Sequence, residues 1–227
     1  MKNSELEWFF SLLKSNTPFA FSRFNDGEMG GISKEGFVAA RGDQVVSREL
    51  RNALIVALQH TQKNYFVGVP CSQCFPEYHG LAMGYLSDES NVQCAVVMTN
   101  RNWKNFVDNI GSAMKGKKVY WVSGDDQDVS KLPFEVHATK FIPNKDSWAH
   151  REMLNGYEHE IESGAVVFIS CGPLARVLVN KWFRTRPDVT FIDIGSTFDP
   201  YTRNVAHRCH TGWENGFNDL PRCSGCN

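Results

Sequence analysis

The sequence has no long hydrophobic run and almost no net charge. Its 227 residues include 24 lysine and arginine residues against 25 aspartate and glutamate residues, which leaves a formal net charge of -1. A chain without a basic excess is not expected to bind nucleic acid or an anionic bilayer non-specifically. The longest apolar runs, such as Ala53–Leu58, fall far short of a membrane span. Any anionic ligand must therefore be bound by local groups.

The N-terminal segment lacks the basic and then apolar layout of a signal peptide. Ser4 and Glu7 instead fit a capping box that opens a helix, whose apolar face would comprise Leu6, Phe9, Phe10 and Leu13. The seven cysteines are an odd number for a disulfide framework, so reduced thiols or metal ligation are expected. Together these features favour a cytoplasmic protein.

No proline-, glycine- or serine-rich linker, repeat or low-complexity stretch divides the chain. With 42% hydrophobic and 22% charged residues, the composition is that of a soluble globular protein with a proper core. We therefore expect one domain over residues 1–227, with an irregular tail rich in cysteine and histidine at 199–227.

Short β-branched runs alternate with longer helical patterns along nearly the whole chain. The runs predict strands at Pro18–Phe24, Tyr65–Val69, Cys94–Met98, Lys118–Val122, Val136–Ile142, Ala165–Ser170 and Val189–Ile194. The helical patterns lie at Ser47–His60, Arg101–Met114, Trp148–Ser163 and Leu174–Arg184. This βαβ rhythm predicts a Rossmann-like α/β fold, with a mostly parallel sheet covered by helices on both faces.

Two carboxylates follow directly after the first predicted strand. Asp26 and Glu28 flank Gly27, which lets a ligand approach the backbone between the acids. Two hard oxygen donors at this spacing suit Mg²⁺ or Mn²⁺, ions that proteins usually share with substrate phosphates. The pair therefore indicates a metal site that neutralises a diphosphate, with Arg23 as a second cation beside it. The alternatives are an ordinary solvated Asn-Asp-Gly turn, and an ion pair between Arg23 and Asp26.

Ligands of parallel α/β sheets bind at the carboxyl ends of the strands, and polar residues follow most of the predicted strands. At Cys171-Gly172-Pro173 a strand joins a helix whose free N–H groups could hold phosphate. Asp193 ends the next strand, where a nucleotide-binding unit carries an acid for a ribose hydroxyl; bracing a neighbouring loop is the alternative role. The predicted nucleotide-binding residues are Arg23, Asn25, Asn100, Arg101, Gly172 and Asp193.

The segment Phe21-Ser-Arg-Phe-Asn-Asp-Gly-Glu, followed by Cys171-Gly-Pro-Leu-Ala and Phe191-Ile-Asp-Ile-Gly-Ser, resembles the GT-D glycosyltransferases. That family was first described as a domain of unknown function in bacterial glycoprotein assembly. The resemblance spans most of the chain, and its most specific element is the Arg-Phe-x-Asp-Gly-Glu block. The sequence departs from the pattern at Asn25, where relatives carry a small residue, and in its tail.

The resemblance implies a Rossmann-like enzyme that binds a nucleoside-diphosphate sugar through a divalent cation on an Asp-x-Glu motif, here Asp26 and Glu28. The expected reaction moves the sugar, with a UDP-sugar as the expected donor, to a glycan or glycoprotein acceptor. Metal ions and helix N-terminal amides suit the charge that develops on the leaving diphosphate. A metal-dependent phosphoesterase or nucleotide-sugar hydrolase, and a non-catalytic nucleotide-sugar-binding module, are the alternative functions.

A base near the acceptor hydroxyl would come from the tail, where His207, His210 and Asp199 are the candidates and Glu214 is a further acid. Surface or structural roles are the alternative for each histidine.

Two Cys-x-x-Cys pairs, Cys71 with Cys74 and Cys223 with Cys226, have the spacing that lets two thiolates reach one ion. Together they predict a shared structural Zn²⁺ that ties the tail to the sheet. Replacement of a ligand by Cys209, His207, His210 or His79, a redox pair, disulfides and independent turn cysteines are the alternatives.

Overall fold

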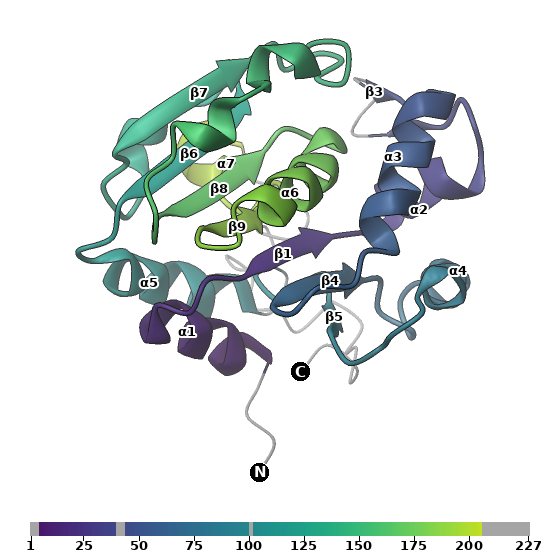
Figure 1. The fold of residues 1–227 in the computed structure, drawn as a ribbon, viewed down its shortest axis with the longest axis horizontal. Helices are drawn as coiled ribbons and strands as arrows, with labels where there is room; N and C mark the ends of the chain where they lie inside the picture. The colour runs from purple at the N-terminus through teal and green to yellow at the C-terminus, as the bar shows by residue number, and fades with distance from the viewer. Residues whose placement is uncertain (1–4, 40–43, 100–101, 206–227) are drawn as a thin grey trace.

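The computed structural model describes residues 5–39, 44–99 and 102–205, and they form one parallel sheet between two layers of helices (Figure 1). Within these residues the sheet has seven strands in the order β5-β4-β1-β9-β8-β6-β7. Every neighbouring pair in it is parallel. The strands are β1 (Ala20–Arg23), β4 (Tyr65–Val69), β5 (Val92–Cys94), β6 (Val119–Gly124), β7 (Ala138–Ile142), β8 (Val166–Ser170) and β9 (Thr190–Asp193). The predicted α/β class and parallel sheet are confirmed.

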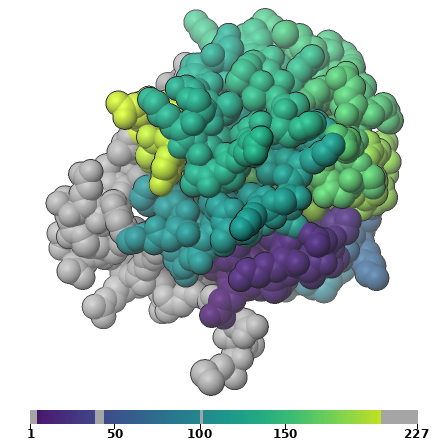
Figure 2. Space-filling view, turned by 90° about the vertical axis from the view of Figure 1, so that its left-hand side faces the viewer, coloured from purple at the N-terminus to yellow at the C-terminus, as the bar shows by residue number. Residues whose placement is uncertain are grey.

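Helices cover both faces of the sheet, as the sequence predicts. On one face, α1 (Glu5–Ser15) and α5 (Trp103–Met114) enclose an aromatic-rich core. The space-filling view shows α1 in purple lying along the teal residues of this layer (Figure 2). On the other face, α3 (Arg48–Leu58) and α6 (Leu174–Thr185) enclose a mainly aliphatic core. Sheet strands buried on both faces need apolar residues at successive positions, and this explains runs such as the one in β8.

The predicted face of α1 is confirmed, since Leu6, Phe9, Phe10 and Leu13 are buried; Ser4 lies outside the described residues. In α3 the Ser47 hydroxyl accepts a hydrogen bond from the Leu50 N–H and caps the helix. Among the described helices, none combines the length and the apolar character that a membrane crossing requires.

The helix predicted at Trp148–Ser163 is wrong. The structure has two short 3₁₀ turns there, η4 (Arg151–Leu154) and η5 (Tyr157–His159), separated by Gly156 with a φ of 80°. Leu154, Tyr157 and Ile161 are buried, and this helix-like spacing of apolar residues accounts for the error. A residue in the left-handed region ends a right-handed helical turn, so the segment cannot continue as one helix.

The strand predicted at Cys94–Met98 is also displaced, because β5 ends at Cys94. Beyond it the chain turns, with the Val97 N–H bonded to the Cys94 carbonyl and the Thr99 N–H to the Val96 carbonyl. The buried apolar residues of this segment therefore fill a turn rather than a strand.

A helix that the sequence does not predict, α2 (Asp26–Ser33), starts where a turn or loop is expected. Glycines at positions 30 and 31 lower helix propensity. They are needed for packing, because a Cβ on Gly30 would lie 2.5 Å from the Phe37 ring and one on Gly31 would lie 2.8 Å from Val46. These neighbours flank a small antiparallel hairpin of β2 (Val38–Ala39) and β3 (Gln44–Val45).

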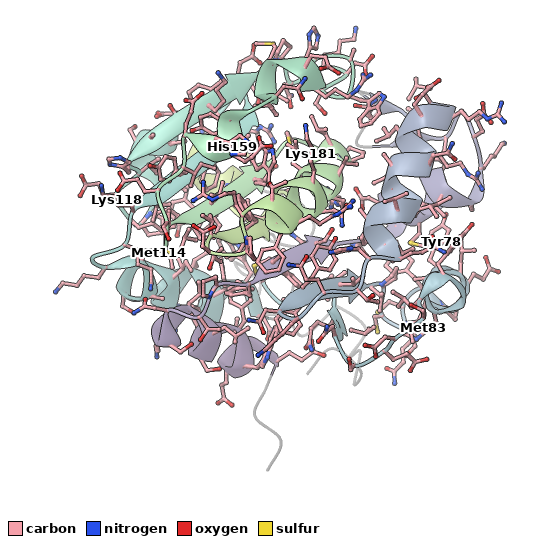
Figure 3. All side chains as sticks on the ribbon, viewed as in Figure 1. Tyr78, Met83, Met114, Lys118, His159 and Lys181 are labelled. Carbon is pink, nitrogen blue, oxygen red and sulfur yellow. The ribbon has the colours of Figure 1, made fainter. Side chains whose placement is uncertain are left out.

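Two further helices lie where none is predicted. The first is α4 (Pro76–Tyr85), which begins with a proline, a residue well suited to a helix start. Figure 3 shows its Tyr78 and Met83 at the margin of the molecule, where both pack partly on the aliphatic core. The second, α7 (Asp199–Thr202), replaces the start of the predicted irregular tail, and the rest of that tail from residue 206 lies outside the described residues.

Candidate functional site

The carboxyl ends of three central strands meet at one point of the sheet. β9 lies between β1 and β8, and the pairs Phe21–Ile192 and Ile169–Asp193 set their register. The segments that follow these strands, at 24–28, 171–173 and 194–197, therefore start side by side. This placement brings Arg23, Glu28, Gly172 and Asp193 together, as their positions after the predicted strands indicate.

Arg176, a residue that no sequence motif singles out, lies at the centre of this group. Its Nε lies 2.8 Å from Asp193 Oδ2 and its Nη2 lies 3.3 Å from Glu28 Oε1. It also donates to the Arg23 carbonyl and, from Nη1 at 2.7 Å, to the Gly172 carbonyl. A charged residue on an otherwise apolar helix face, one turn after a Gly-Pro pair, is the signal that could have revealed it.

Asp193 is fully buried, and both of its oxygens are bonded. Oδ2 accepts from the Arg23 backbone N–H at 3.2 Å in addition to facing Arg176, and Oδ1 accepts from the Gly195 N–H at 3.1 Å. Burial raises the pKa of this carboxyl, and the two nearby guanidinium groups oppose that rise. These contacts are typical of a carboxylate that braces neighbouring loops, the alternative role considered for Asp193, rather than of one that binds a ribose hydroxyl.

Glu28 is also buried, at 8% exposure, in the first turn of α2. Its Oε2 accepts from the backbone N–H of Asn25, the N-cap residue, at 3.1 Å, while Oε1 faces Arg176. The first contact is one half of a capping box and satisfies an N–H at the start of the helix. Burial raises the pKa of Glu28, against the opposing effect of Arg176.

The Arg23 guanidinium ties β1 to two neighbouring loops. Its Nε donates to the Ala95 carbonyl at 2.8 Å, and its Nη1 donates to the Ile194 carbonyl at 2.8 Å. At 6% exposure it joins the segments after β5, β1 and β9. A guanidinium bound to backbone carbonyls holds loops in place, so Arg23 shapes the site.

A second chain of hydrogen bonds holds the turn after β9 against β8. The Gln127 amide donates to the Ser170 hydroxyl at 2.9 Å, and that hydroxyl donates to the Gly195 carbonyl at 2.8 Å. Gln127 and Ser170 are both buried. Neither residue is a site candidate from the sequence, because an isolated Gln or Ser carries no recognisable pattern.

Gly195 has a φ of +51°, and a Cβ built there would lie 2.9 Å from Arg23 Nη1. We expect Gly195→Ala to lower the free energy of unfolding by about 2 kcal/mol, from backbone strain and the displaced guanidinium. Gly172→Ala is the matched control, since its φ is +58° but the added Cβ meets only the Ser147 hydroxyl, at 3.9 Å. Urea denaturation of both variants measures the difference, and equal losses would show that contact with Arg23 adds nothing.

The β2–β3 hairpin approaches the same end of the sheet through Gln44, which is 3% exposed. Its amide donates to Asp146 Oδ1 at 2.8 Å and accepts from the Trp148 N–H at 3.3 Å. The adjacent Ser147 hydroxyl donates to the Cys171 carbonyl at 2.8 Å. The segment after β7 thus lies between the hairpin and the β8–α6 turn.

Asp199, a candidate base, is 1% exposed and lies 3.1 Å from the Arg203 guanidinium. Arg203 also pairs with Asp126 at 2.8 Å and donates to Asn144. These contacts join α7 to the loops that follow β6 and β7. A general base must reach the acceptor hydroxyl, and a buried, ion-paired Asp199 is not placed to do so.

The two acids of the Asp-x-Glu segment fit a metal ion differently. Asp26 is half-buried at the first position of α2 and can contribute one carboxylate beside substrate phosphates. Glu28 lies two positions further on, about 200° around the helix, and its oxygens face Arg176 and the Asn25 N–H. Within the described residues there is no group of three His, Cys, Asp or Glu side chains arranged for a metal. Asp26 can serve as a ligand from this position, whereas both oxygens of Glu28 are already engaged.

Several predicted site residues lie outside the described residues: Asn100, Arg101, His207, His210, Cys223 and Cys226, with the alternatives Cys209 and Glu214. Of the zinc candidates that are described, Cys71 is buried and Cys74 is exposed, both after β4. The zinc site therefore stays a prediction.

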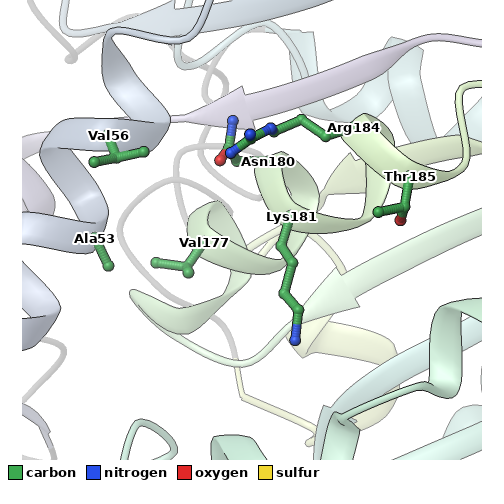
Figure 4. Close-up of a pocket in the computed structure, with 7 residues that line it drawn as sticks. All are labelled: Ala53, Val56, Val177, Asn180, Lys181, Arg184 and Thr185. Atoms are coloured by element: carbon green, nitrogen blue, oxygen red, sulfur yellow. The ribbon is translucent and has the colours of Figure 1, made fainter.

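A shallow pocket of about 460 Å³ lies between α3 and α6, over the face of the sheet (Figure 4). Figure 4 shows Lys181 and Arg184 on the later turns of α6, away from the start of that helix. The pocket includes none of the predicted site residues, and they gather instead at the carboxyl ends of the strands.

The structure is an open parallel α/β fold with its loops grouped at the carboxyl edge of the sheet, the edge where such sheets generally bind ligands. Three solved structures share this fold. One is a selenomethionine-substituted structure of domain of unknown function 1792, with a TM-score of 0.68 and 15% identity over 93% of this chain and 80% of that one. Another is described as a new glycosyltransferase of this domain from Streptococcus sanguinis, with a TM-score of 0.68 and 16% identity over 90% and 85%.

A third structure, described as a distinct glycosyltransferase fold, has a TM-score of 0.67 and 16% identity over 86% of this chain and 79% of that one. No protein-family model matches the sequence, and no curated protein is significantly similar to it. The GT-D resemblance read from the segment that includes Arg23 and Glu28 is thus confirmed at the level of the fold.

Proposed function

We propose that this protein is a glycosyltransferase that moves a sugar from a nucleoside-diphosphate sugar to a glycan or glycoprotein acceptor. One observation carries the proposal. In a fold described in its structural neighbours as that of a glycosyltransferase, α2 and α6 start at the carboxyl ends of β1 and β8, the two strands that flank β9. The UDP-sugar donor remains our expectation.

The starts of two helices suit the diphosphate of such a donor. Backbone N–H groups at a helix start are unpaired within the helix and lie at the positive end of its dipole. At α6 the preceding Gly172 is exposed and has no side chain, and an added Cβ would meet only Ser147 at 3.9 Å. The Ala175 N–H of the first turn donates to the Gly172 carbonyl at 3.1 Å. We assign these amides to the phosphates, where they stabilise the charge that develops as the sugar leaves.

Asp26 is the acid that we place beside the diphosphate. A divalent ion, Mn²⁺ or Mg²⁺, would neutralise phosphate charge when bound there with Asp26. Asp193, Arg176 and Arg23 keep the surrounding loops in place, so the N–H groups stay oriented before the donor arrives. Such preorganisation is the main way in which a protein stabilises a charged leaving group.

The test is a thermal-shift panel of UDP, GDP, ADP and CDP, with and without Mn²⁺, on the full chain. A ligand at about 100 times its Kd adds about 2.7 kcal/mol to the free energy of unfolding, so one base should raise the Tm clearly. The matching nucleotide sugar is then incubated with and without glycan acceptors. Transfer supports the proposal, acceptor-independent hydrolysis supports the hydrolase, and binding without turnover supports the non-catalytic module.

We expect Asp26→Asn to remove the part of UDP binding that depends on Mn²⁺, weakening it at least about tenfold, because the amide lacks the carboxylate charge. Isothermal titration of UDP with Mn²⁺ and with EDTA measures the effect. Asp88→Asn, an exposed acid before β5, is the control and should bind as the unmodified protein does. Full Mn²⁺-dependent affinity in Asp26→Asn would remove Asp26 from the site.

A further inference from the structure

In the sequence, the two acids of the Asp-x-Glu segment look like one metal-binding unit. In the structure, the second acid, Glu28, contacts other protein groups. Glu28 faces Arg176, which in turn lies against Asp193. The side chains of all three residues are at most 10% exposed. With Arg23 close to Asp193, two acids and two guanidinium groups form an electrically balanced buried cluster.

A divalent ion on Glu28 would disturb this balance. Arg176 Nη2 already lies 3.3 Å from Glu28 Oε1, and a metal ligated there would place two more positive charges beside the guanidinium. Displacing Arg176 would leave Asp193 buried without its main partner, which is strongly unfavourable. The other oxygen already accepts the Asn25 N–H at the start of α2.

We propose that Glu28 is a positioning residue rather than a metal ligand. Its carboxylate links the first turn of α2 to Arg176 on α6, and thereby fixes the two helix starts relative to each other. Asp26 is then the one acid of the Asp-x-Glu segment that meets the ligand. The inference rests on the proposed function for the identity of the ligand, and on the geometry of Glu28 alone for its structural part.

The first experiment compares Glu28→Gln with Glu28→Ala. Glutamine keeps one acceptor oxygen, which can take a hydrogen bond from either the Asn25 N–H or Arg176, whereas alanine keeps none. We expect Glu28→Ala to weaken UDP binding at least about tenfold and Glu28→Gln to restore it to within about threefold, with the dependence on Mn²⁺ unchanged. If Glu28→Gln abolished the Mn²⁺ dependence of UDP binding, as we expect Asp26→Asn to do, the proposal would be overturned.

The second experiment needs no nucleotide and so separates this inference from the proposed function. A double-mutant cycle combines Glu28→Gln with Arg176→Met and follows the Tm of each variant. Because the two side chains interact, we expect the Tm loss from Glu28→Gln to shrink in the Arg176→Met background. Mn²⁺ binding alone, measured by electron paramagnetic resonance, should be the same in Glu28→Gln as in the unmodified protein. Additive Tm losses, or a loss of Mn²⁺ affinity in Glu28→Gln, would contradict the inference even if no nucleotide binds.

Discussion

Replacing Arg176 with methionine is expected to lower the free energy of unfolding by about 3–5 kcal/mol, because it leaves the buried carboxylates of Glu28 and Asp193 without their shared cation. The loss also removes hydrogen bonds to the Arg23 and Gly172 carbonyls. Methionine roughly keeps the volume, so the effect reports on charge and hydrogen bonding rather than on a cavity. Urea denaturation followed by circular dichroism measures it.

The matched control for Arg176→Met is Arg184→Met, on the same helix but exposed. Surface substitutions of this kind usually change stability by less than about 0.5 kcal/mol. If the two variants were equally stable, the cluster around Arg176 would not hold the site together. The proposals for Arg176 and Glu28 would then both fail.

Phe198→Ala is expected to cost about 3–5 kcal/mol, because the ring is 1% exposed and leaves a cavity when it is removed. Its ring centre lies 5.8 Å from that of Phe106, 5.9 Å from Trp121 and 5.5 Å from Phe134. The residue comes after the last strand, directly before α7. A large loss would show that the chain beyond β9 is part of the aromatic core.

The control for Phe198→Ala is Phe141→Ala on the edge strand β7, where the ring is 36% exposed. We expect a clearly smaller loss there, because less apolar surface is buried and solvent fills the space. Thermal unfolding monitored by calorimetry compares the two variants. Equal losses would place Phe198 outside the cooperative core.

The candidate site consists of a buried set of charged residues that holds the loops and of separate groups that contact the ligand. Arg23, Arg176 and Asp193 bind backbone groups and one another, and so fix the loops at the carboxyl edge before a donor arrives. Asp26 and the helix starts are then the groups that meet the ligand. Substitutions of these three residues should affect stability and binding together, whereas Asp26→Asn should chiefly affect the binding that depends on Mn²⁺.

The sequence predicts the sheet well because each strand is a short apolar run, and such a run can be recognised without knowing which distant residues it contacts. Six of the seven predicted strands coincide with observed ones within a few residues. It fails at 148–163, where Leu154, Tyr157 and Ile161 keep a helix-like spacing although Gly156 breaks the backbone. It fails again at α2, because glycines at 30 and 31 hide a helix that is stabilised by packing against Phe37 and Val46.

By itself the sequence determined the α/β class, the parallel sheet and the edge where polar residues gather, because strand and helix periods and the polar ends of strands are local features. Only the tertiary structure decided the roles within the Asp-x-Glu segment. Arg176 lies far from Glu28 along the chain, and the two meet because α6 packs beside β1 and β9. Whether a carboxylate faces an arginine, an N–H group or a ligand depends on such distant contacts, and no local pattern records them.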